Sequence, residues 1–121
     1  MGNFRVPLEI GPLDILRFEG IEALVDTGAT YSWVPRDVLD RLGIRPEEEW
    51  PFVMADGREV MYPIASVRVR MLGRTRATVA VFGEPGTEPL LGVVTLEEFG
   101  LAVDPISRRL LPVRALLKLA G

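Results

Sequence analysis

The 121-residue sequence contains no cysteine and no histidine, and its only lysine is Lys118, near the C-terminus. Without cysteine, the protein has no disulfide, no thiolate nucleophile and no cysteine-based metal site. Without histidine, Ser-His-Asp and Cys-His catalysis and the usual zinc ligand sets are also excluded. Acid–base catalysis must then come from carboxylates, tyrosine, a bound cofactor or Lys118, which is poorly placed for a central base.

Other absences narrow the class of protein. No apolar run approaches the roughly 20 residues of a membrane helix, and no apolar core of a signal peptide follows the N-terminus. The net charge is −3 and there is no long basic run, which argues against nucleic acid as the main partner. We therefore expect a cytoplasmic protein with neither a membrane nor a nucleic-acid partner. The length and the 48% hydrophobic content predict one globular domain over residues 1–121.

The pattern of apolar residues predicts a mostly β protein with two short helices. We expect strands over residues 4–10, 13–18, 21–25, 101–103 and 110–113, and two hairpins that turn at Asp56-Gly57 and at Gly73. We expect helices over residues 35–42 and from a capping box at Thr95 to Gly100. Residues 19–20 are expected to form a turn, and residues 45–51 an acidic loop.

An apolar run over residues 23–25 leads directly into Asp26-Thr27-Gly28. A carboxylate at the end of a buried strand is costly unless it is hydrogen-bonded or shares a proton with another acid. Asp26 is therefore a candidate catalytic carboxylate, and the plain alternative is an ordinary turn residue. The triplet occurs once in the chain, and the other aspartates lack its apolar context.

Three features, in this order, resemble those of retropepsin-like (retroviral-type) aspartic proteases over roughly residues 20–113. They are Asp26-Thr27-Gly28-Ala29, the glycine-tipped hairpin at Ala55-Asp56-Gly57 where the family has its flap, and Leu90-Leu91-Gly92 followed by a short helix. The resemblance implies a retropepsin-like closed β barrel with one or two short helices. It also implies a two-fold homodimer, because one chain supplies only one of the two carboxylates that the reaction needs.

The resemblance further assigns roles to these residues. One Asp26 from each subunit would activate a water molecule to hydrolyse a peptide bond, with neither a metal nor a cofactor. Thr27 would brace the two loops across the two-fold axis, while Gly28 and Ala29 would present backbone groups to an extended peptide. The flap at residues 55–57 would close over that peptide and exclude water.

The same resemblance gives Leu90-Leu91-Gly92 a packing role beneath the loop of Asp26. The chain departs from the retroviral pattern at Thr30, where an acidic residue is usual, and at Val93, where an arginine is usual. Both partners of an ionic pair are therefore missing, and the dimer must depend on other contacts. We expect the apolar C-terminal tail, residues 114–121, to contribute to the dimer interface rather than to the core.

Two aromatic residues near these motifs need an interpretation. Trp33 is expected to lie in the core or at the interface rather than to contact substrate. In pepsin-like enzymes the corresponding tryptophan packs near a flap tyrosine. Here Tyr62 lies beyond the predicted turn of the flap, so we do not assign it to that packing.

Two other functions are compatible with the sequence. The first is a catalytically inactive dimerisation or peptide-binding module that retains the fold, because the glycine-rich viral flap tip is missing. The second is a basic-faced β barrel that binds an anionic partner through the alternating arginines at positions 68, 70, 74 and 76. A solvated strand face is the simpler interpretation of these arginines, since no aromatic residues are interleaved with them.

Overall fold

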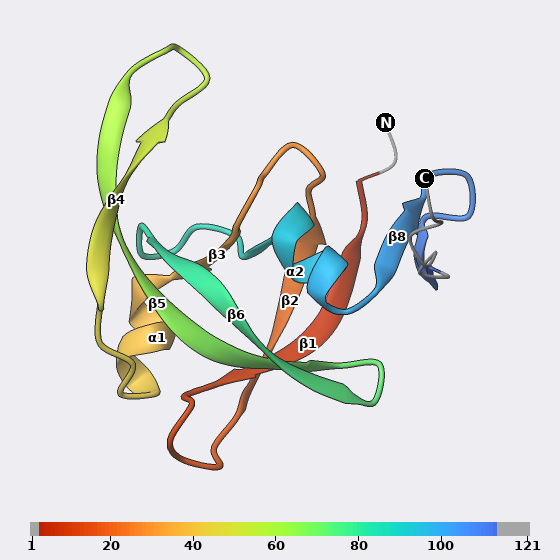
Figure 1. Cartoon of the computed structure of the whole chain (residues 1–121), viewed down its shortest axis with the longest axis horizontal. Coiled ribbons are helices and arrows are strands. Elements are labelled where there is room, and N and C mark those ends of the chain that lie inside the picture. The colour runs from red at the N-terminus through yellow and green to blue at the C-terminus, as the bar shows by residue number, and fades with distance from the viewer. Residues whose placement is uncertain (1–2, 114–121) are drawn as a thin grey trace, which may run out of the picture.

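The computed structural model describes residues 3–113 as a mostly β fold with two short helices (Figure 1). In chain order the elements are β1 (Arg5–Gly11), β2 (Glu19–Val25), β3 (Ser32–Pro35), α1 (Arg36–Arg41), β4 (Glu48–Val53), β5 (Glu59–Met71), β6 (Arg74–Gly83), β7 (Leu90–Leu91), α2 (Val93–Glu98), β8 (Leu101–Asp104) and β9 (Arg109–Pro112). The main sheet has the order β1-β2-β7-β3-β6-β5-β4, and β1 also pairs with β5. Six strands therefore close into a ring, as predicted, and β4 extends from β5 at its edge.

Both predicted hairpins are confirmed. Residues 64–71 of β5 pair with residues 74–81 of β6. The two strands meet at a two-residue turn, in which Leu72 and Gly73 have positive φ angles of 51° and 76°. A two-residue turn of this kind matches the twist of the strands that it joins. Strands β4 and β5 form the other hairpin, which projects from the ring at the upper left of Figure 1. Gly57 at its turn has a φ of 88°, which favours glycine.

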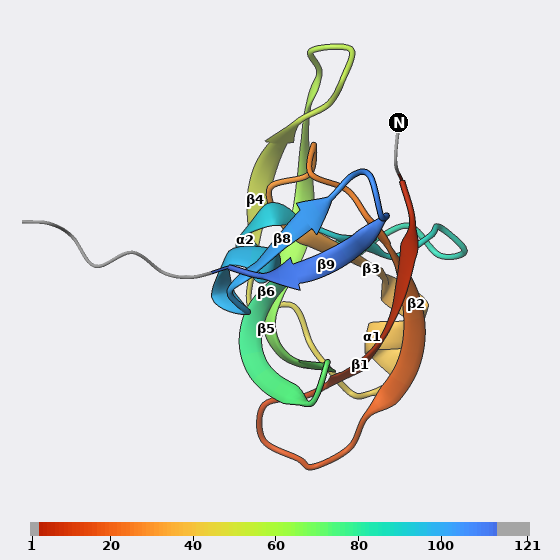
Figure 2. The ribbon, with the colours of Figure 1, turned by 90° about the vertical axis from the view of Figure 1, so that its right-hand side faces the viewer.

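Apolar side chains fill the interior of the ring. Ile10, Val67 and Leu91 are each at most 1% exposed and come from three different strands. The helices close the core, with Leu39 of α1 and Phe99 after α2 equally buried. The separate β8–β9 pair lies beside α2, as Figure 2 shows, and α2 contacts both β6 and β8. No helix within residues 3–113 is long and apolar enough to cross a membrane.

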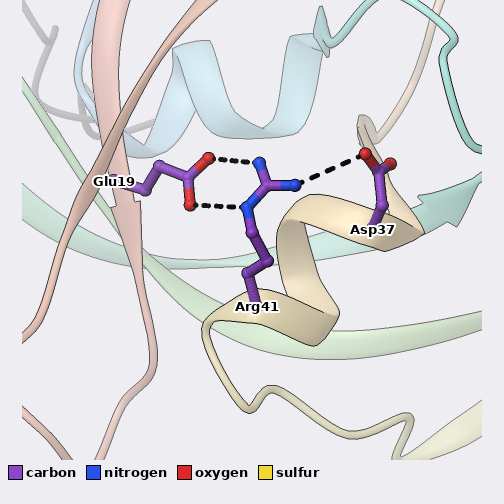
Figure 3. A network of polar contacts seen from close by, with 3 residues as sticks. All are labelled: Glu19, Asp37 and Arg41. Carbon is purple, nitrogen blue, oxygen red and sulfur yellow. Dashed lines mark hydrogen bonds and ion pairs between the residues drawn. The ribbon is translucent and has the colours of Figure 1, made fainter.

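An ion-pair network joins α1 to the beginning of β2. Figure 3 shows Arg41 between Glu19 and Asp37. Its Nη2 lies 2.5 Å from Glu19 Oε2, and its Nη1 lies 3.5 Å from Asp37 Oδ2, one helical turn earlier. All three side chains are at least 30% exposed, so we regard the network as a tether for the short helix rather than a large contribution to stability.

The segment after β1 differs from the prediction. Residues 13–18 form a loop instead of a strand, and the expected turn at 19–20 is the beginning of β2. The reason is the side chain of Arg68, which donates hydrogen bonds to the carbonyls of Pro12 and Leu13 at 3.1 and 2.9 Å. The chain folds back on itself so closely here that a Cβ added to Gly11 would lie 2.1 Å from the Arg17 carbonyl oxygen.

The arginines of the β5–β6 hairpin are only partly a solvated face. Besides Arg68, Arg70 is engaged within the molecule, donating to both carboxylate oxygens of Glu9 at 2.8 and 3.1 Å. Its guanidinium also lies 3.9 Å from the centre of the Phe18 ring. The hydrogen bonds from Arg70 hold the pKa of the Glu9 carboxyl below its ordinary value. Two of the four arginines proposed for an anionic partner are therefore committed to contacts within the chain.

The boundaries of β4 and α2 differ from the prediction, and one further expectation concerns residues outside the described part of the chain. Strand β4 begins at Glu48, inside the expected loop over residues 45–51, because Glu48–Val53 pairs with β5. Helix α2 begins at Val93, two residues before the predicted cap at Thr95, and ends as expected before Gly100, whose φ is 66°. The expected interface tail, residues 114–121, lies outside the described residues.

Candidate active site

Asp26 lies at the end of β2, where the loop that follows holds its carboxylate in place. Its backbone N–H donates to the Leu91 carbonyl at 3.0 Å, which continues the pairing of β2 with β7. The Gly28 N–H donates to Asp26 Oδ1 at 2.9 Å, and the Ala29 N–H donates to the Asp26 carbonyl at 3.1 Å. The side chain is half-buried, so one carboxylate oxygen is fixed while the group stays accessible.

The short strand β7 pairs with the strands on both sides of this loop. It lies between β2 and β3, with Leu91 opposite Val25 and Leu90 opposite Trp33. Leu91 is 1% exposed and belongs to the core, whereas Leu90 is half-buried and reaches the surface near Asp26. The segment therefore lies against both ends of the loop that carries Asp26.

The beginning of α2 is hydrogen-bonded to the same loop. The first helical N–H groups have no partner inside a helix, and here they donate to the loop carbonyls. Val93 donates to Ala29 at 2.9 Å and Val94 donates to Thr30 at 2.9 Å. Thr30 and Val93, the two positions where the ionic partners of the retroviral pattern are missing, each take part in one of these bonds. Val93 is the donor of the first bond, and the Thr30 carbonyl is the acceptor of the second. The backbone of α2 thus holds the loop without charged side chains.

A group of three buried hydroxyls lies behind the loop. Thr95 is fully buried, and its Oγ1 lies 2.7 Å from Ser32 Oγ and 2.9 Å from Thr78 Oγ1. The Gly92 N–H donates to Ser32 Oγ at 3.0 Å, which links the group to the turn before α2. The expected capping role of Thr95 is therefore wrong. Because its hydroxyl finds partners on β3 and β6, it fastens α2 to the ring instead.

A cleft of about 700 Å³ separates the loop of Asp26 from the β4–β5 hairpin. Its walls consist mainly of apolar and aromatic side chains, with Asp26 as the one charged group among the lining residues of the described chain. The lining residues are Asp26, Gly28, Ala29, Thr30, Tyr31, Trp33, Trp50, Pro51, Phe52, Val53, Met54, Ala55 and Leu90. The loop of Asp26 and the hairpin predicted as a flap therefore face the same hollow, whereas Thr27 is exposed beside it.

The tip of this hairpin is a closed turn that carries charge. Asp56 accepts hydrogen bonds from the Arg58 backbone N–H at 3.0 Å and from Arg58 Nε at 2.6 Å. These bonds hold the pKa of the Asp56 carboxyl below its ordinary value. The Gly57 N–H closes the turn on the Met54 carbonyl at 2.9 Å. Ala55 lines the cleft, whereas Asp56 and Gly57 lie exposed at the tip, outside its lining.

Five aromatic rings, the aromatic cluster, join the hairpin to the body beside the cleft. The contacting rings have centres 4.9–6.4 Å apart and belong to Tyr31, Trp33, Trp50, Phe52 and Tyr62. The sequence interpretation missed this cluster. Tyr62 lies 4.9 Å from Trp33, a packing that we did not assign to it, and Trp33 lines the cleft. The alternation of Trp50 and Phe52, which places both rings on one face of a strand, was the available signal.

Comparison with known proteins agrees with this geometry. Residues 18–98 match the family model described as gag-polyprotein putative aspartyl protease. Among solved structures, EIAV protease in complex with the inhibitor HBY-793 is 17% identical, with a TM-score of 0.63, 95% coverage of this chain and 93% of that one. Simian foamy virus (mac) protease is 22% identical, with a TM-score of 0.54 and coverages of 76% and 92%. A foamy viral protease-reverse transcriptase in complex with an RNA/DNA hybrid is 14% identical, with a TM-score of 0.63. The match covers 98% of this chain and 14% of that protein. No curated protein matches the chain.

Proposed function

Because the chain belongs to the family of gag-polyprotein putative aspartyl proteases, we propose that it is an aspartic endopeptidase that acts as a homodimer. The retroviral-protease fold supports this proposal, since the likeness to EIAV protease extends over 95% of the chain. The observation that carries it is the placement of Asp26, the one carboxylate on the wall of the cleft. A single subunit supplies half of the required acid–base pair, so the partner subunit must supply the other half.

In the proposed reaction the two Asp26 carboxyl groups face each other and share one proton, because two adjacent carboxylates do not both ionise. The ionised group takes a proton from a water molecule as the water oxygen attacks the carbonyl carbon of the peptide. The protonated group gives its proton to the carbonyl oxygen. The protonated carboxyl then gives its proton to the leaving nitrogen as the C–N bond breaks, and the ionised carboxylate takes a proton from one hydroxyl of the tetrahedral intermediate. The products are a carboxylic acid and an amine, and the pair again holds a single proton.

The loop and the hairpin would hold the substrate as an extended strand. The N–H groups of Gly28 and Ala29 are already bound to Asp26, and the Ala29 carbonyl accepts from Val93. The Gly28 carbonyl is then the group of these two residues that remains to accept from a peptide N–H. Residues 55–57 at the hairpin tip would cover the bound peptide, and exposed Thr27 would contact the partner's loop.

The decisive experiment replaces the carboxylate and keeps its shape. We expect Asp26→Asn to abolish cleavage of a peptide mixture, because the amide provides neither the base nor the acid of the pair. Sedimentation and thermal unfolding should show a folded dimer like the wild type. Cleavage that persists in rigorously purified Asp26→Asn protein would refute the assignment. A wild-type protein that binds peptides across a wide pH range without cleaving them would instead indicate an inactive peptide-binding module.

A further inference from the structure

An apolar hollow of about 350 Å³ lies outside the active-site cleft, between β1, the β5–β6 turn and the turn that leads into β9. Its apolar lining includes Phe4, Val6, Met71 and Leu110, and it shares no lining residue with the cleft. Ligand pockets commonly have volumes of about 300–1,000 Å³, so this hollow has room for a few side chains rather than for a folded domain.

Backbone strain is concentrated at this hollow. Within residues 3–113, two residues other than glycine have positive φ angles, and both line it: Leu72 at 51° in the β5–β6 turn and Arg108 at 57° between β8 and β9. Asn or Gly is the usual first residue of a two-residue hairpin turn like the one that contains Leu72. The Leu72 side chain is 67% exposed, so packing does not explain its presence there. Strain and an exposed apolar side chain thus occur together, as is typical of a binding surface.

The charged groups on the hollow are all arginines. Arg5, Arg108 and Arg109 line it, and among the described residues no Asp or Glu does. Arg5 is paired with Glu88, whereas the Arg108 side chain donates from Nη2 to the neutral Asn3 carbonyl at 2.9 Å. Neither Arg108 nor Arg109 forms an ion pair with a carboxylate in the part of the chain that the structure describes. In a protein with a net charge of −3, this hollow is therefore a local positive site.

The hollow continues along the surface on the other side of Leu72. A neighbouring hollow of about 620 Å³ has Pro7, Met71 and Leu72 in common with it, so the two adjoin. A ligand that covers the exposed Leu72 side chain therefore lies against both hollows. This shape suits an extended chain better than a small molecule, because an extended chain can follow both hollows while it covers Leu72.

We propose that this arginine-lined hollow binds an extended segment of a partner protein that carries an Asp or Glu among apolar residues. The apolar side chains of the segment pack against Phe4, Val6 and Leu72. Its carboxylate accepts hydrogen bonds from the guanidinium groups of Arg108 and Arg109, which suit carboxylates well. Binding at this site does not require cleavage and does not depend on the catalytic role of Asp26.

NMR titration of isotopically labelled Asp26→Asn protein locates and measures the binding, because this variant is expected to leave the peptide intact. The probes are end-capped Gly-Leu-Glu-Leu-Gly and the same peptide with Gln or with Lys in place of Glu. We expect the amide signals of Leu72 and Arg108 to shift. The Glu peptide should bind about three- to tenfold more tightly than the Gln peptide, and the Lys peptide most weakly. Shifts confined to Gly28 and Ala29 in the cleft, or equal affinities for Glu and Lys, would overturn the proposal.

Replacement of both free arginines tests the charged half of the site. Arg108→Gln combined with Arg109→Gln should bring the Glu-to-Gln affinity ratio close to one. Arg76→Gln is the matched control, because Arg76 is exposed on β6 and lines neither hollow. If the double variant does not fold, Arg109→Gln alone should lower the ratio. A folded variant that retains the wild-type ratio would show that these arginines do not bind the carboxylate.

Leu72→Asn tests the apolar half together with the strain. Asn adopts a positive φ angle more easily than Leu, so the melting temperature should stay unchanged or rise by up to roughly 5 °C. Binding of the Glu peptide should weaken about three- to tenfold, because an apolar contact is lost. Unchanged binding would contradict the proposal. A clear fall in the melting temperature would also contradict it, since Leu72 would then serve the fold.

Other occupants of the hollow predict different results. If the hollow is a contact between subunits, no peptide should bind to it, and the double arginine variant should weaken the dimer in sedimentation. If it holds a fatty acid, decanoate should shift the Leu72 signal and the peptides should not. Either result would overturn the proposal and leave the endopeptidase assignment intact. Glu-selective binding at Leu72 by a protein whose wild type cleaves nothing would do the reverse.

Discussion

Gly92 is a residue at which a single added atom would meet the loop of Asp26 directly. A Cβ at this position would lie 2.5 Å from the carbonyl carbon and oxygen of Tyr31 and 3.0 Å from the Ala29 oxygen. Both neighbours are backbone, so the loop itself would have to move. Its φ of −94° suits any residue, and the constraint is therefore one of space rather than of backbone conformation.

We expect Gly92→Ala to lower the free energy of unfolding by about 3 kcal/mol and to abolish cleavage by displacing Asp26. Gly20→Ala is a matched control, because nothing lies within 4 Å of its added Cβ and the residue is within β2. That control should leave stability unchanged or raise it by up to about 1 kcal/mol. Urea unfolding measures both variants. Wild-type stability in Gly92→Ala would mean that the loop accommodates the methyl group.

Thr95 is the second residue with a specific structural demand. Thr95→Val keeps the shape of the side chain but removes the hydroxyl, so Ser32 and Thr78 lose their shared buried partner. We expect a loss of about 1–3 kcal/mol in the free energy of unfolding. Thr95→Ser, which keeps the hydroxyl and removes one methyl, should lose about 1 kcal/mol. The order would be reversed if the methyl group, rather than the hydroxyl, held α2 to the ring.

Among the elements, the β8–β9 hairpin has a turn organised by one carboxylate. Asp104 accepts the Ser107 hydroxyl at 2.7 Å and the backbone N–H groups of Ile106 and Ser107 at 3.0 and 3.3 Å. The Ser107 hydroxyl first, then the two backbone groups and nearby Arg109, hold the pKa of the Asp104 carboxyl below its ordinary value of 3.8. A lowered folded-state pKa stabilises the protein above the ordinary value and stops doing so as the pH falls through the folded value.

Asp104→Asn should therefore be less stable than the wild type near neutral pH, and the difference should vanish in acid. We expect the two melting temperatures to converge only as the pH falls through the lowered pKa of Asp104 in the folded state, where the wild-type carboxyl becomes protonated as well. Thermal unfolding over a pH series measures this convergence. Asp14→Asn in the exposed loop after β1 controls for the loss of a negative charge. A difference between Asp104→Asn and wild type that is independent of pH would mean that the charge contributes nothing.

The β4–β5 hairpin is anchored through its strands, up to Phe52 next to the turn, and ends in a self-contained turn. Phe52 contacts three other rings of the aromatic cluster, Tyr31, Trp33 and Tyr62. Beyond this anchor, Asp56 and Arg58 pair with each other at the exposed tip. Motion that admits a peptide is thus expected in the turn beyond Val53, while the cluster keeps the strands of the hairpin against the segment that follows the loop of Asp26.

For the whole molecule, the central prediction concerns two chains. If each active site contains one Asp26 from each subunit, a dimer with one Asp26→Asn chain is inactive. Adding an equal amount of Asp26→Asn protein to the wild type, with time for subunit exchange, should then reduce the cleavage rate by about half. A ninefold excess should reduce it by about 90%. Folded Gly20→Ala protein carrying an intact Asp26 serves as the exchange control. A rate unaffected by added variant would contradict the shared site.

The same pair predicts how activity depends on pH. Catalysis needs one carboxyl protonated and one ionised, so the rate should fall on both sides of a maximum. The fall on the acid side must be separated from unfolding, because the lowered pKa values of Glu9, Asp56 and Asp104 also make the fold less stable in acid. Thermal unfolding at each pH distinguishes the two causes.

Much of the fold follows from local pattern. Alternation predicted the two hairpins and most strands, because the face on which a side chain lies depends only on its position along the strand. Gly57 and Gly73 marked the turns of the hairpins, because a positive φ angle favours glycine whatever the rest of the fold is. The apolar run into Asp26 predicted both the end of β2 and the candidate carboxylate, and the single copy of the motif led to the prediction of a dimer.

The tertiary structure alone decided contacts between distant segments. Arg68 converted an expected strand into a loop by bonding to carbonyls more than 50 positions away. Thr95 found its partners on β3 and β6 instead of capping its own helix. The aromatic cluster unites residues 31–33 with β4 and β5. A local pattern specifies which face of an element is apolar, but closure of the ring and the register of its strands determine which side chains meet. The catalytic role of Asp26 is therefore a prediction from the sequence motif, whereas the cleft beside it depends on the folded ring.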